Sequence, residues 1–195
     1  DLAHANYRHT IADVGDAAAV RGMVRSIIAE WGGIDALLNN AGVASMNALL
    51  LTPQETVENV FRTNACGTFN LMREVGKVMT RAKAGRIVNF SSIARPLDLE
   101  GEAAYAASKA AVESLTRVAA RELGRHGITV NAVGPTAIET ALTATVPKAK
   151  LAELRARQAL PGEGTVADVI HVVEFFLHPD SSAISGQVVY LGGVS

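Results

Sequence analysis

A tyrosine and a lysine stand four positions apart at Tyr105 and Lys109, with Ser92 upstream of them. Residues four apart on an α-helix lie above one another on one face, so these two side chains are expected to be neighbours. A free phenol has a pKa near ~10, and an ammonium group beside it favours the phenolate and lowers that pKa toward neutrality. With the Ser92 hydroxyl opposite, the three groups can hold a carbonyl or alcohol oxygen while a proton moves onto it or off it. The residues therefore predict redox chemistry at a C–O bond.

The composition of the chain fits one domain in a reducing compartment. Its 195 residues are 49% hydrophobic, enough for one substantial core, and its formal net charge is −1. The basic residues form no stripe, which argues against a nucleic-acid partner. The single cysteine, Cys66, excludes an intramolecular disulfide. No apolar run approaches the ~20 residues that span a bilayer, so we expect a cytoplasmic protein with no membrane association.

Short apolar runs alternate with longer segments of helical periodicity along the whole chain. The first helix is expected to begin after the N-cap Asp16 and to end at Gly32. A second helical region is expected from 53 to about 81, with irregularities at Asn64 and Gly67. The remaining predicted helices cover 103–123, 148–159 and 165–177, and the predicted strands cover 9–12, 34–38, 86–90, 127–130 and 187–191.

This alternation of strand and helix predicts a doubly wound parallel sheet with helices on both faces, a Rossmann-like three-layer α/β/α arrangement. We expect one nucleotide-binding domain over residues 1–195, in which 136–164 forms a substrate-side loop or lid. Ligands of such sheets bind beyond the carboxyl ends of the strands. Polar or glycine-containing groups follow four predicted strands, and Tyr105, in the first turn of a helix, returns to the same edge. The groups at the strand ends are Asp13, 39–42, 91–92 and 131–136.

The predicted sheet apparently lacks its first strand–helix–strand unit. A dinucleotide site of this kind uses a glycine-rich turn after the first strand, and no such turn precedes Asp13. The unit takes roughly 30 or more residues, so we expect the sequence to be N-terminally incomplete. Asp1 would then close the second strand and bind an adenosine ribose, which would favour NAD over NADP.

The motifs together resemble the short-chain dehydrogenase/reductase family, in its compact single-domain branch and with members similar to 3-oxoacyl-acyl-carrier-protein reductases. The resemblance runs from about Thr10 to Gly193. Its motifs occur in family order and at family spacing: Asn39-Asn40-Ala41-Gly42, Asn64, Ser92, Tyr105-x-x-x-Lys109 and Asn131-Ala132-Val133-Gly134-Pro135.

The resemblance implies a role for each matched position. Tyr105 would be the general acid or base, and Lys109 would lower its pKa and bind the nicotinamide ribose. Ser92 would polarise the substrate oxygen, and Asn64 would hold a water in a proton relay. Hydride would pass between the substrate and NAD or NADP. The residues implied to contact that cofactor are Asp13, Val14, Asn39, Ala41, Gly42, Tyr105, Lys109, Pro135, Ile138 and Thr140.

Two departures from the family pattern accompany the match. The glycine-rich turn is absent, which leaves cofactor affinity open, and Thr136 stands where the family usually has glycine after Pro135.

The predicted activity is the NAD(P)-dependent interconversion of a carbonyl and a secondary alcohol. A 3-oxoacyl thioester is the leading substrate, ahead of small cyclic or secondary alcohols. Apolar residues in the predicted substrate segments favour it: Leu97, Leu99, Leu142, Val146 and Leu151.

Two rival functions remain open from the residues. A non-catalytic nucleotide sensor or scaffold on the same fold would suit a missing phosphate turn. A serine hydrolase would use Ser92, but the chain has neither Gly-x-Ser-x-Gly nor Ser-x-x-Lys around it.

Other features of the sequence are assigned structural or assembly roles. Ser91 is interpreted as structural, and Asp13 has two interpretations, a cofactor contact and a helix cap. A polar helix face explains His171, Glu174 and His178 better than a metal site does, so no metal is expected. The alanine-rich helix over 103–123 is interpreted as a dimer face, which predicts a homo-oligomer, a dimer or tetramer.

Overall fold

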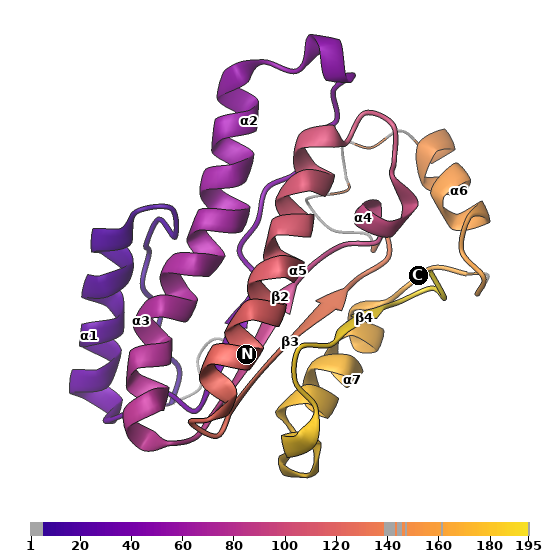
Figure 1. The fold of residues 1–195 in the computed structure, drawn as a ribbon. Helices are drawn as coiled ribbons and strands as arrows, with labels where there is room; N and C mark the ends of the chain where they lie inside the picture. Colours follow the sequence, from indigo (N-terminus) through magenta and orange to yellow (C-terminus); the bar gives the residue numbers. More distant parts are fainter. Residues whose placement is uncertain (1–5, 139–142, 144–145, 147, 161, 195) are drawn as a thin grey trace.

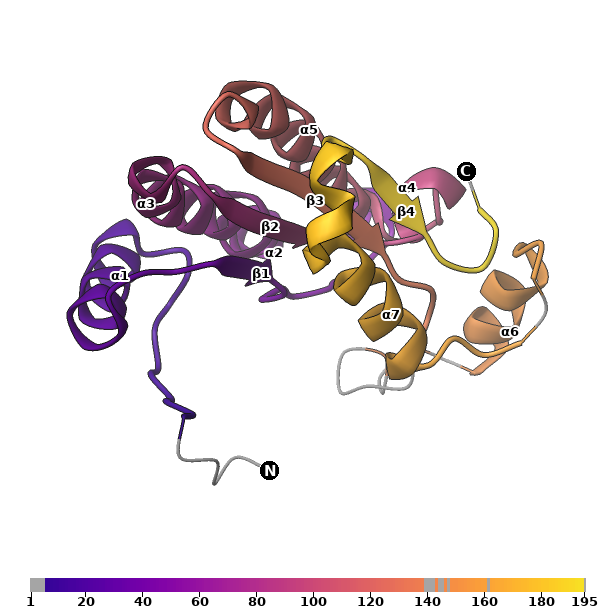
Figure 2. The same cartoon turned by 90° about the horizontal axis from the view of Figure 1, so that it is seen from below.

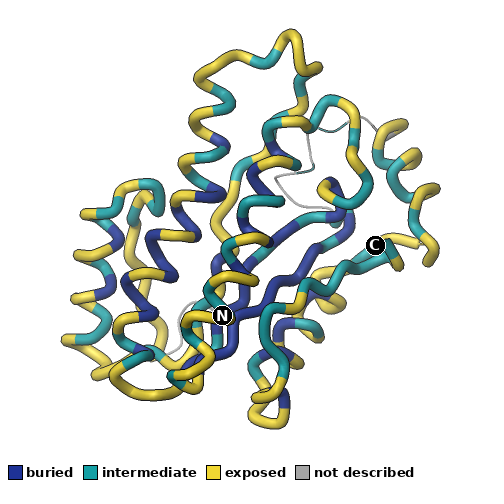
Figure 3. Tube along the Cα trace, viewed as in Figure 1, coloured by how far each residue is buried: buried dark blue, intermediate teal, exposed yellow. Residues whose placement is uncertain are grey.

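The computed structural model describes residues 6–138, 143, 146, 148–160 and 162–194. Four parallel strands form one sheet in the order β1 (Ala36–Asn39), β2 (Gly85–Phe90), β3 (Ile128–Gly134) and β4 (Val188–Tyr190) (Figure 1). The ladder aligns Asn39 with Asn89 and Val88 with Asn131. The two central strands, β2 and β3, are buried along nearly their whole length (Figure 3). Burial on both faces explains why the sequence of these strands is almost continuously apolar.

Helices cover both faces of this sheet, which confirms the predicted doubly wound architecture. Helices α3 (Gly67–Ala82) and α5 (Ala103–Gly124) lie on one face and α7 (Val166–Leu177) lies on the other (Figure 2). Helix α1 (Ala17–Trp31) packs beside α3. Successive residues of β2 pack on opposite faces of the sheet. Ile87 packs in the core formed with α1 and α3, whereas Val88 packs against α7. This alternation is the period-2 pattern of a strand between two apolar layers.

Local signals place the ends of α1 where the sequence predicts them. The Asp16 carboxylate accepts hydrogen bonds from the N–H groups of Ala18 at 2.7 Å and Ala19 at 3.3 Å, which satisfies two of the unpaired donors of the first turn. The helix ends at Gly32, which adopts φ +81°, a conformation that glycine allows without strain.

The predicted irregularity in the second helical region is a π-helical turn. Helix α2 (Gln54–Phe61) continues into the turn Arg62–Cys66 and then into α3. A Cβ on Gly67 would lie 2.6 Å from Cγ2 of Val14, so this junction needs glycine. Such turns insert one extra residue and redirect side chains, often beside functional sites. Here the turn carries Asn64.

One predicted element is wrong, because no strand forms over 9–12. These residues are irregular, and Ile11 is 90% exposed. An extended segment becomes a strand only when a neighbour pairs with it, and no described strand does so. The remaining helices are α4 (Ala94–Leu97), α6 (Lys148–Ala156) and the 3₁₀ turns Leu49–Leu51 and Pro179–Ala183. No helix in the described ranges is both long and apolar enough to span a membrane.

Candidate active site

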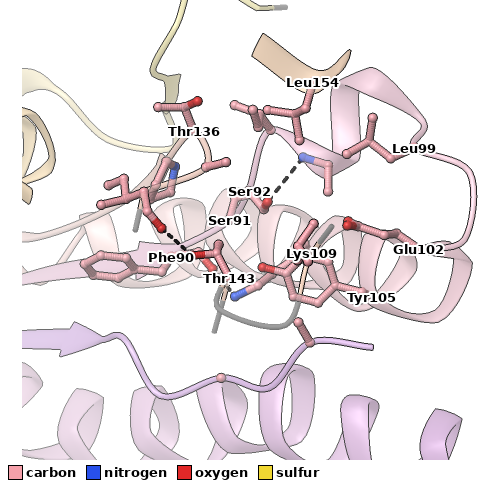
Figure 4. A pocket seen from close by; sticks show the side chains of 18 of the residues that line it. Phe90, Ser91, Ser92, Leu99, Glu102, Tyr105, Lys109, Thr136, Thr143 and Leu154 are labelled. Carbon is pink, nitrogen blue, oxygen red and sulfur yellow. Dashed lines mark hydrogen bonds between the residues drawn. The ribbon is translucent and has the colours of Figure 1, made fainter. Parts of the chain in front are cut away.

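The carboxyl ends of β1, β2 and β3 meet at one edge of the sheet, and the first turn of α5 returns to it (Figure 1). A cavity of about 730 Å³ opens there. Its walls include Gly42 after β1, Ser92 after β2 and Thr136 after β3, together with Tyr105 and Lys109 from α5. Figure 4 shows these side chains around the cavity. The topology therefore brings together residues that are up to 94 positions apart (42 to 136).

Tyr105 and Lys109 form the polar side of this cavity and are both largely buried, with 8% and 5% of their surface exposed. The Nζ atom of Lys109 donates to the carbonyl oxygen of Phe90 at 2.8 Å and lies 5.7 Å from the centre of the Tyr105 ring. The Ser92 hydroxyl accepts from the N–H of Ala94 at 3.2 Å, which holds it against the turn after β2. The structure therefore places Ser92, Tyr105 and Lys109 beside one cavity, as the sequence predicts.

The pKa of Tyr105 moves in the opposite direction to the sequence expectation. Burial raises it, a hydrogen bond with Ser92 lowers it, and the charge of Glu102 raises it. Lys109 is not among these causes, so the lowering by lysine stays a prediction. Burial also lowers the pKa of Lys109 itself, to about 8. Burial disfavours the charged form of each group, which is the phenolate of Tyr105 and the ammonium of Lys109.

Asn64 uses its side chain to connect the end of β1 to α5. Its Oδ1 accepts from the N–H of Val43 at 2.8 Å, and its Nδ2 donates to the Val43 carbonyl and to Oγ of Ser108, each at 2.9 Å. Ser108 in turn donates to the carbonyl of Tyr105 at 2.7 Å. The amide is thus committed to protein partners and holds the segment after β1 against the helix of Tyr105.

We expect Asn64→Ala to lower the free energy of unfolding by about 2 kcal/mol, since it leaves buried polar groups without partners. Urea denaturation followed by circular dichroism measures this loss. Asn59→Ala is the matched control, because Asn59 lies on α2 shortly before the turn and is exposed. Equal losses in the two variants would contradict the assignment of a bridging role to Asn64.

A buried cluster behind the cavity was not predicted from the sequence. The hydroxyl of Ser91 donates to Oε1 of Glu113 at 2.7 Å, and the Tyr190 hydroxyl donates to the same oxygen. Arg95 and Arg117 lie 3.4 Å from Oε2 of Glu113. Burial, followed by the bond to Glu113, raises the pKa of Tyr190. The cluster ties β4 and α4 to the turn that carries Ser92, in line with the structural role predicted for Ser91.

One sequence signal could have identified this cluster. Glu113 stands four residues after Lys109, which itself stands four after Tyr105, so all three share one stripe of α5. A carboxylate on a stripe that faces the protein interior needs partners. The sequence shows that Glu113 lies on this stripe, but only the fold shows that the partners come from β2, α4 and β4.

The other residues predicted to contact a cofactor are only partly gathered at the cavity. Pro135 and Ile138 line it, as Gly42 does, whereas Asn39 and Ala41 belong to the same turn but do not line its wall. Asp13 and Val14 are also outside its lining. Thr140 and Asp1 lie outside the described residues.

Asp13 and Val14 are held by α3 and the π-helical turn. The Asp13 carboxylate accepts from Arg62 at 2.7 Å and from the N–H of Gly15 at 2.8 Å, and these bonds lower its pKa. The Val14 carbonyl accepts from Asn70 at 3.1 Å. These contacts give the segment before α1 a fixed backbone.

One wall of the cavity carries many apolar residues, alongside charged ones such as Lys150 and Glu153. Among the apolar residues predicted to meet a substrate, Leu99, Val146 and Leu151 line the cavity. Leu97 does not line it, and Leu142 lies outside the described residues. Leu154 and residues of α7 complete this wall. An acyl chain is the kind of group that such a surface accommodates.

The chain beside Gly42 fits the sugar end of a nicotinamide cofactor. A Cβ on Gly42 would lie 3.2 Å from Oδ1 of Asn64 and 3.5 Å from Nζ of Lys109, so glycine keeps the backbone beside the ammonium group open. Lys109 has three donors, of which the described contacts use one, on Phe90. Oδ1 of Asn39 is buried without a hydrogen-bond partner in the described ranges. The unused donors of Lys109 suit the hydroxyl groups of a ribose.

Comparisons with known proteins identify relatives of this chain. The family model described as enoyl-(acyl carrier protein) reductase matches residues 3–194. A 3-oxoacyl-[acyl-carrier-protein] reductase of Staphylococcus aureus is 34% identical over 182 residues, which cover 93% of this chain and 74% of that protein. The (2S)-[(R)-hydroxy(phenyl)methyl]succinyl-CoA dehydrogenase subunit BbsD of Thauera aromatica is 38% identical over 183 residues, or 94% and 73% of the two chains. The structure of ElxO with NADP bound has a TM-score of 0.88 at 30% identity and covers 95% of this chain and 77% of its own.

Proposed function

The chain belongs to the short-chain dehydrogenase/reductase family of NAD(P)-dependent oxidoreductases, and we propose that its cavity reduces the 3-oxo group of an acyl thioester to the alcohol. The convergence of Tyr105, Ser92 and Lys109 on one cavity with an apolar far wall carries this proposal. Acid–base groups on one side and an acyl-sized apolar surface on the other match the two halves of such a substrate.

Each of these residues has a task in the proposed reaction. Ser92 and Tyr105 hold the substrate oxygen by hydrogen bonds, and Tyr105 transfers its phenolic proton to that oxygen as the carbonyl becomes an alcohol. The ammonium group of Lys109 stabilises the phenolate that this transfer leaves, and it binds the cofactor ribose. The nicotinamide supplies the hydride when bound. Asn64 positions the turn after β1 through Val43, and the water contact predicted from the sequence stays a prediction.

The proposed substrate class has two sources of support. The walls contributed by Leu99, Val146 and Leu151 are apolar. Two relatives are named for acyl groups on a carrier, one on acyl carrier protein and one on CoA. A saturated ketone without a thioester would fill less of a cavity of about 730 Å³.

The test is the oxidation of NADPH and of NADH by the purified protein with 3-oxobutanoyl-CoA, followed by the loss of absorbance of the reduced cofactor. We expect turnover that depends on the thioester and on Ser92, with Ser92→Ala slower by about two orders of magnitude. Equal rates with cyclohexanone and with the thioester would contradict the substrate class. The same titration compares the two cofactors. The ElxO neighbour contains NADP, and we propose NADPH as the first cofactor to test.

We further propose that copies of the chain associate as a homo-oligomer through α3 and α5. These helices contact each other and expose Phe69 and Val118, which are 46% and 50% exposed. Apolar side chains on adjacent helices favour a partner surface. We expect light scattering to give at least twice the 20.4 kDa of one chain, and Val118→Glu to lower that mass. Ile11→Glu, at a position 90% exposed away from these helices, should not lower it. A monomeric wild-type protein would contradict the proposal.

A further inference from the structure

Glu102 is a carboxylate on the wall of the cavity to which the reaction described above assigns no task. It precedes α5 as its N-cap residue and lines the cavity three positions before Tyr105. Figure 4 shows its side chain on the same side of the cavity as Ser92 and Tyr105, with Leu99 and Leu154 nearby. The carboxylate therefore faces the place where a substrate must lie.

Among the described residues, none is a partner for the side chain of this carboxylate. The Glu102 side chain accepts no N–H of the first turn of α5. Within the described ranges no hydrogen bond or ion pair reaches it, and burial alone raises its pKa. Glu74, by contrast, pairs with Lys77 at 2.9 Å and Arg73 at 3.0 Å. A partly buried carboxylate without a partner lowers stability, so the fold gains nothing from Glu102.

Glu102 also acts electrically on the reacting groups. Its charge raises the pKa of Tyr105, which places the two groups within electrostatic reach of each other. A substrate oxygen held between Ser92 and Tyr105 puts the neighbouring atoms of the substrate within the same reach. A negative group on those atoms would meet the negative charge of Glu102 across the cavity.

We propose that Glu102 is a specificity-determining residue that excludes anionic ketones, so that the site accepts a 3-oxoacyl group as its neutral thioester and rejects the free 3-oxo acid. The proposal rests on the proposed function and names the chemical state of its substrate. Two carboxylates ~6 Å apart at an effective dielectric constant of ~20 repel strongly enough for a discrimination of about 10- to 100-fold.

The test compares two matched ligand pairs in Glu102→Gln. The first pair is unreactive, butanoate against S-butanoyl-N-acetylcysteamine, and saturation-transfer NMR gives its dissociation constants without turnover. The second pair is reactive, 3-oxobutanoate against S-(3-oxobutanoyl)-N-acetylcysteamine, and it gives kcat/KM with the reduced cofactor. Glutamine keeps the shape of the side chain and removes its charge. Glu100→Gln is the matched control, because Glu100 lines the same mouth but is exposed.

We expect Glu102→Gln to improve binding and kcat/KM for the anionic member of each pair by at least tenfold, and to change the thioester values less than threefold. Glu100→Gln should leave both ratios within threefold of the wild type. An unchanged ratio of anion to thioester values in Glu102→Gln, or an equal change in Glu100→Gln, would overturn the inference. The proposed reductase function would still stand. A wild type that shows the expected binding preference in both pairs but does not reduce S-(3-oxobutanoyl)-N-acetylcysteamine would overturn the proposed function and leave the charge selection by Glu102 in place.

Discussion

Tyr105→Phe is expected to lower kcat/KM for ketone reduction by about three orders of magnitude and to leave the fold unchanged. The variant removes one oxygen atom, the proton donor to the substrate, and general acid catalysis contributes ~10²- to 10⁴-fold. The remaining ring keeps the apolar contacts of a side chain that is 8% exposed. Among the described contacts, the hydroxyl interacts with Ser92 alone, so its loss costs the fold little.

The measurement is steady-state reduction of the thioester, with thermal unfolding of each variant as the check on folding. Tyr7→Phe is the control, because Tyr7 is a tyrosine on the exposed segment before α1. This variant also separates an enzyme from a nucleotide sensor. A sensor would bind cofactor without turnover and would be indifferent to Tyr105→Phe, and that result would exclude the acid–base role.

Lys109→Met is expected to lower kcat/KM by at least two orders of magnitude. It should also remove the fall in the rate of ketone reduction that we expect in the wild type at high pH. Burial lowers the pKa of Lys109 to about 8, so its ammonium form is lost as the pH rises through that value. The rate of ketone reduction in the wild type should therefore fall above pH ~8. Methionine fills a similar volume and does not titrate, so the fall should be absent from the variant.

The pH dependence of the free energy of unfolding tests the lowered pKa of Lys109 independently of activity. The folded-state pKa of Lys109 lies below its ordinary value of 10.5, so the unfolded chain binds more protons between pH 8 and 10.5. The free energy of unfolding should rise with pH across this window, and the cost of burying the ammonium group should be fully present below pH 8. Lys109→Met should flatten that rise.

Lys150→Met is the control for both measurements, because Lys150 also lines the cavity but lies on α6 with an exposed side chain. Urea denaturation at several pH values gives the stability profile, and initial rates over the same range give the activity profile. The role assigned to Lys109 would be contradicted by two results together. These are a wild-type rate of ketone reduction that does not fall up to pH ~10 and a rate in Lys109→Met equal to that of the wild type.

Much of the fold was predictable because its signals are local. The carboxylate of Asp16 and the absent side chain of Gly32 act on atoms within a few residues, so the limits of α1 follow from the sequence. The apolar run of β2 reports burial on both faces. The strand predicted over 9–12 is wrong because a strand depends on a partner distant in the chain, which local pattern does not supply.

For the site, the sequence by itself determined which groups meet. Parallel topology sends the ends of β1, β2 and β3 to one edge, and helical spacing stacks Tyr105 over Lys109, so the convergence with Ser92 followed from order along the chain. Only the tertiary structure decided the environment of these groups. Three features depend on which distant residues surround each group. They are the raised pKa of Tyr105, the hydrogen bonds of the Asn64 amide with Val43 and Ser108, and the lack of a side-chain partner for Glu102 among the described residues. Desolvation and hydrogen bonding act through space, and the sequence records only neighbours along the chain.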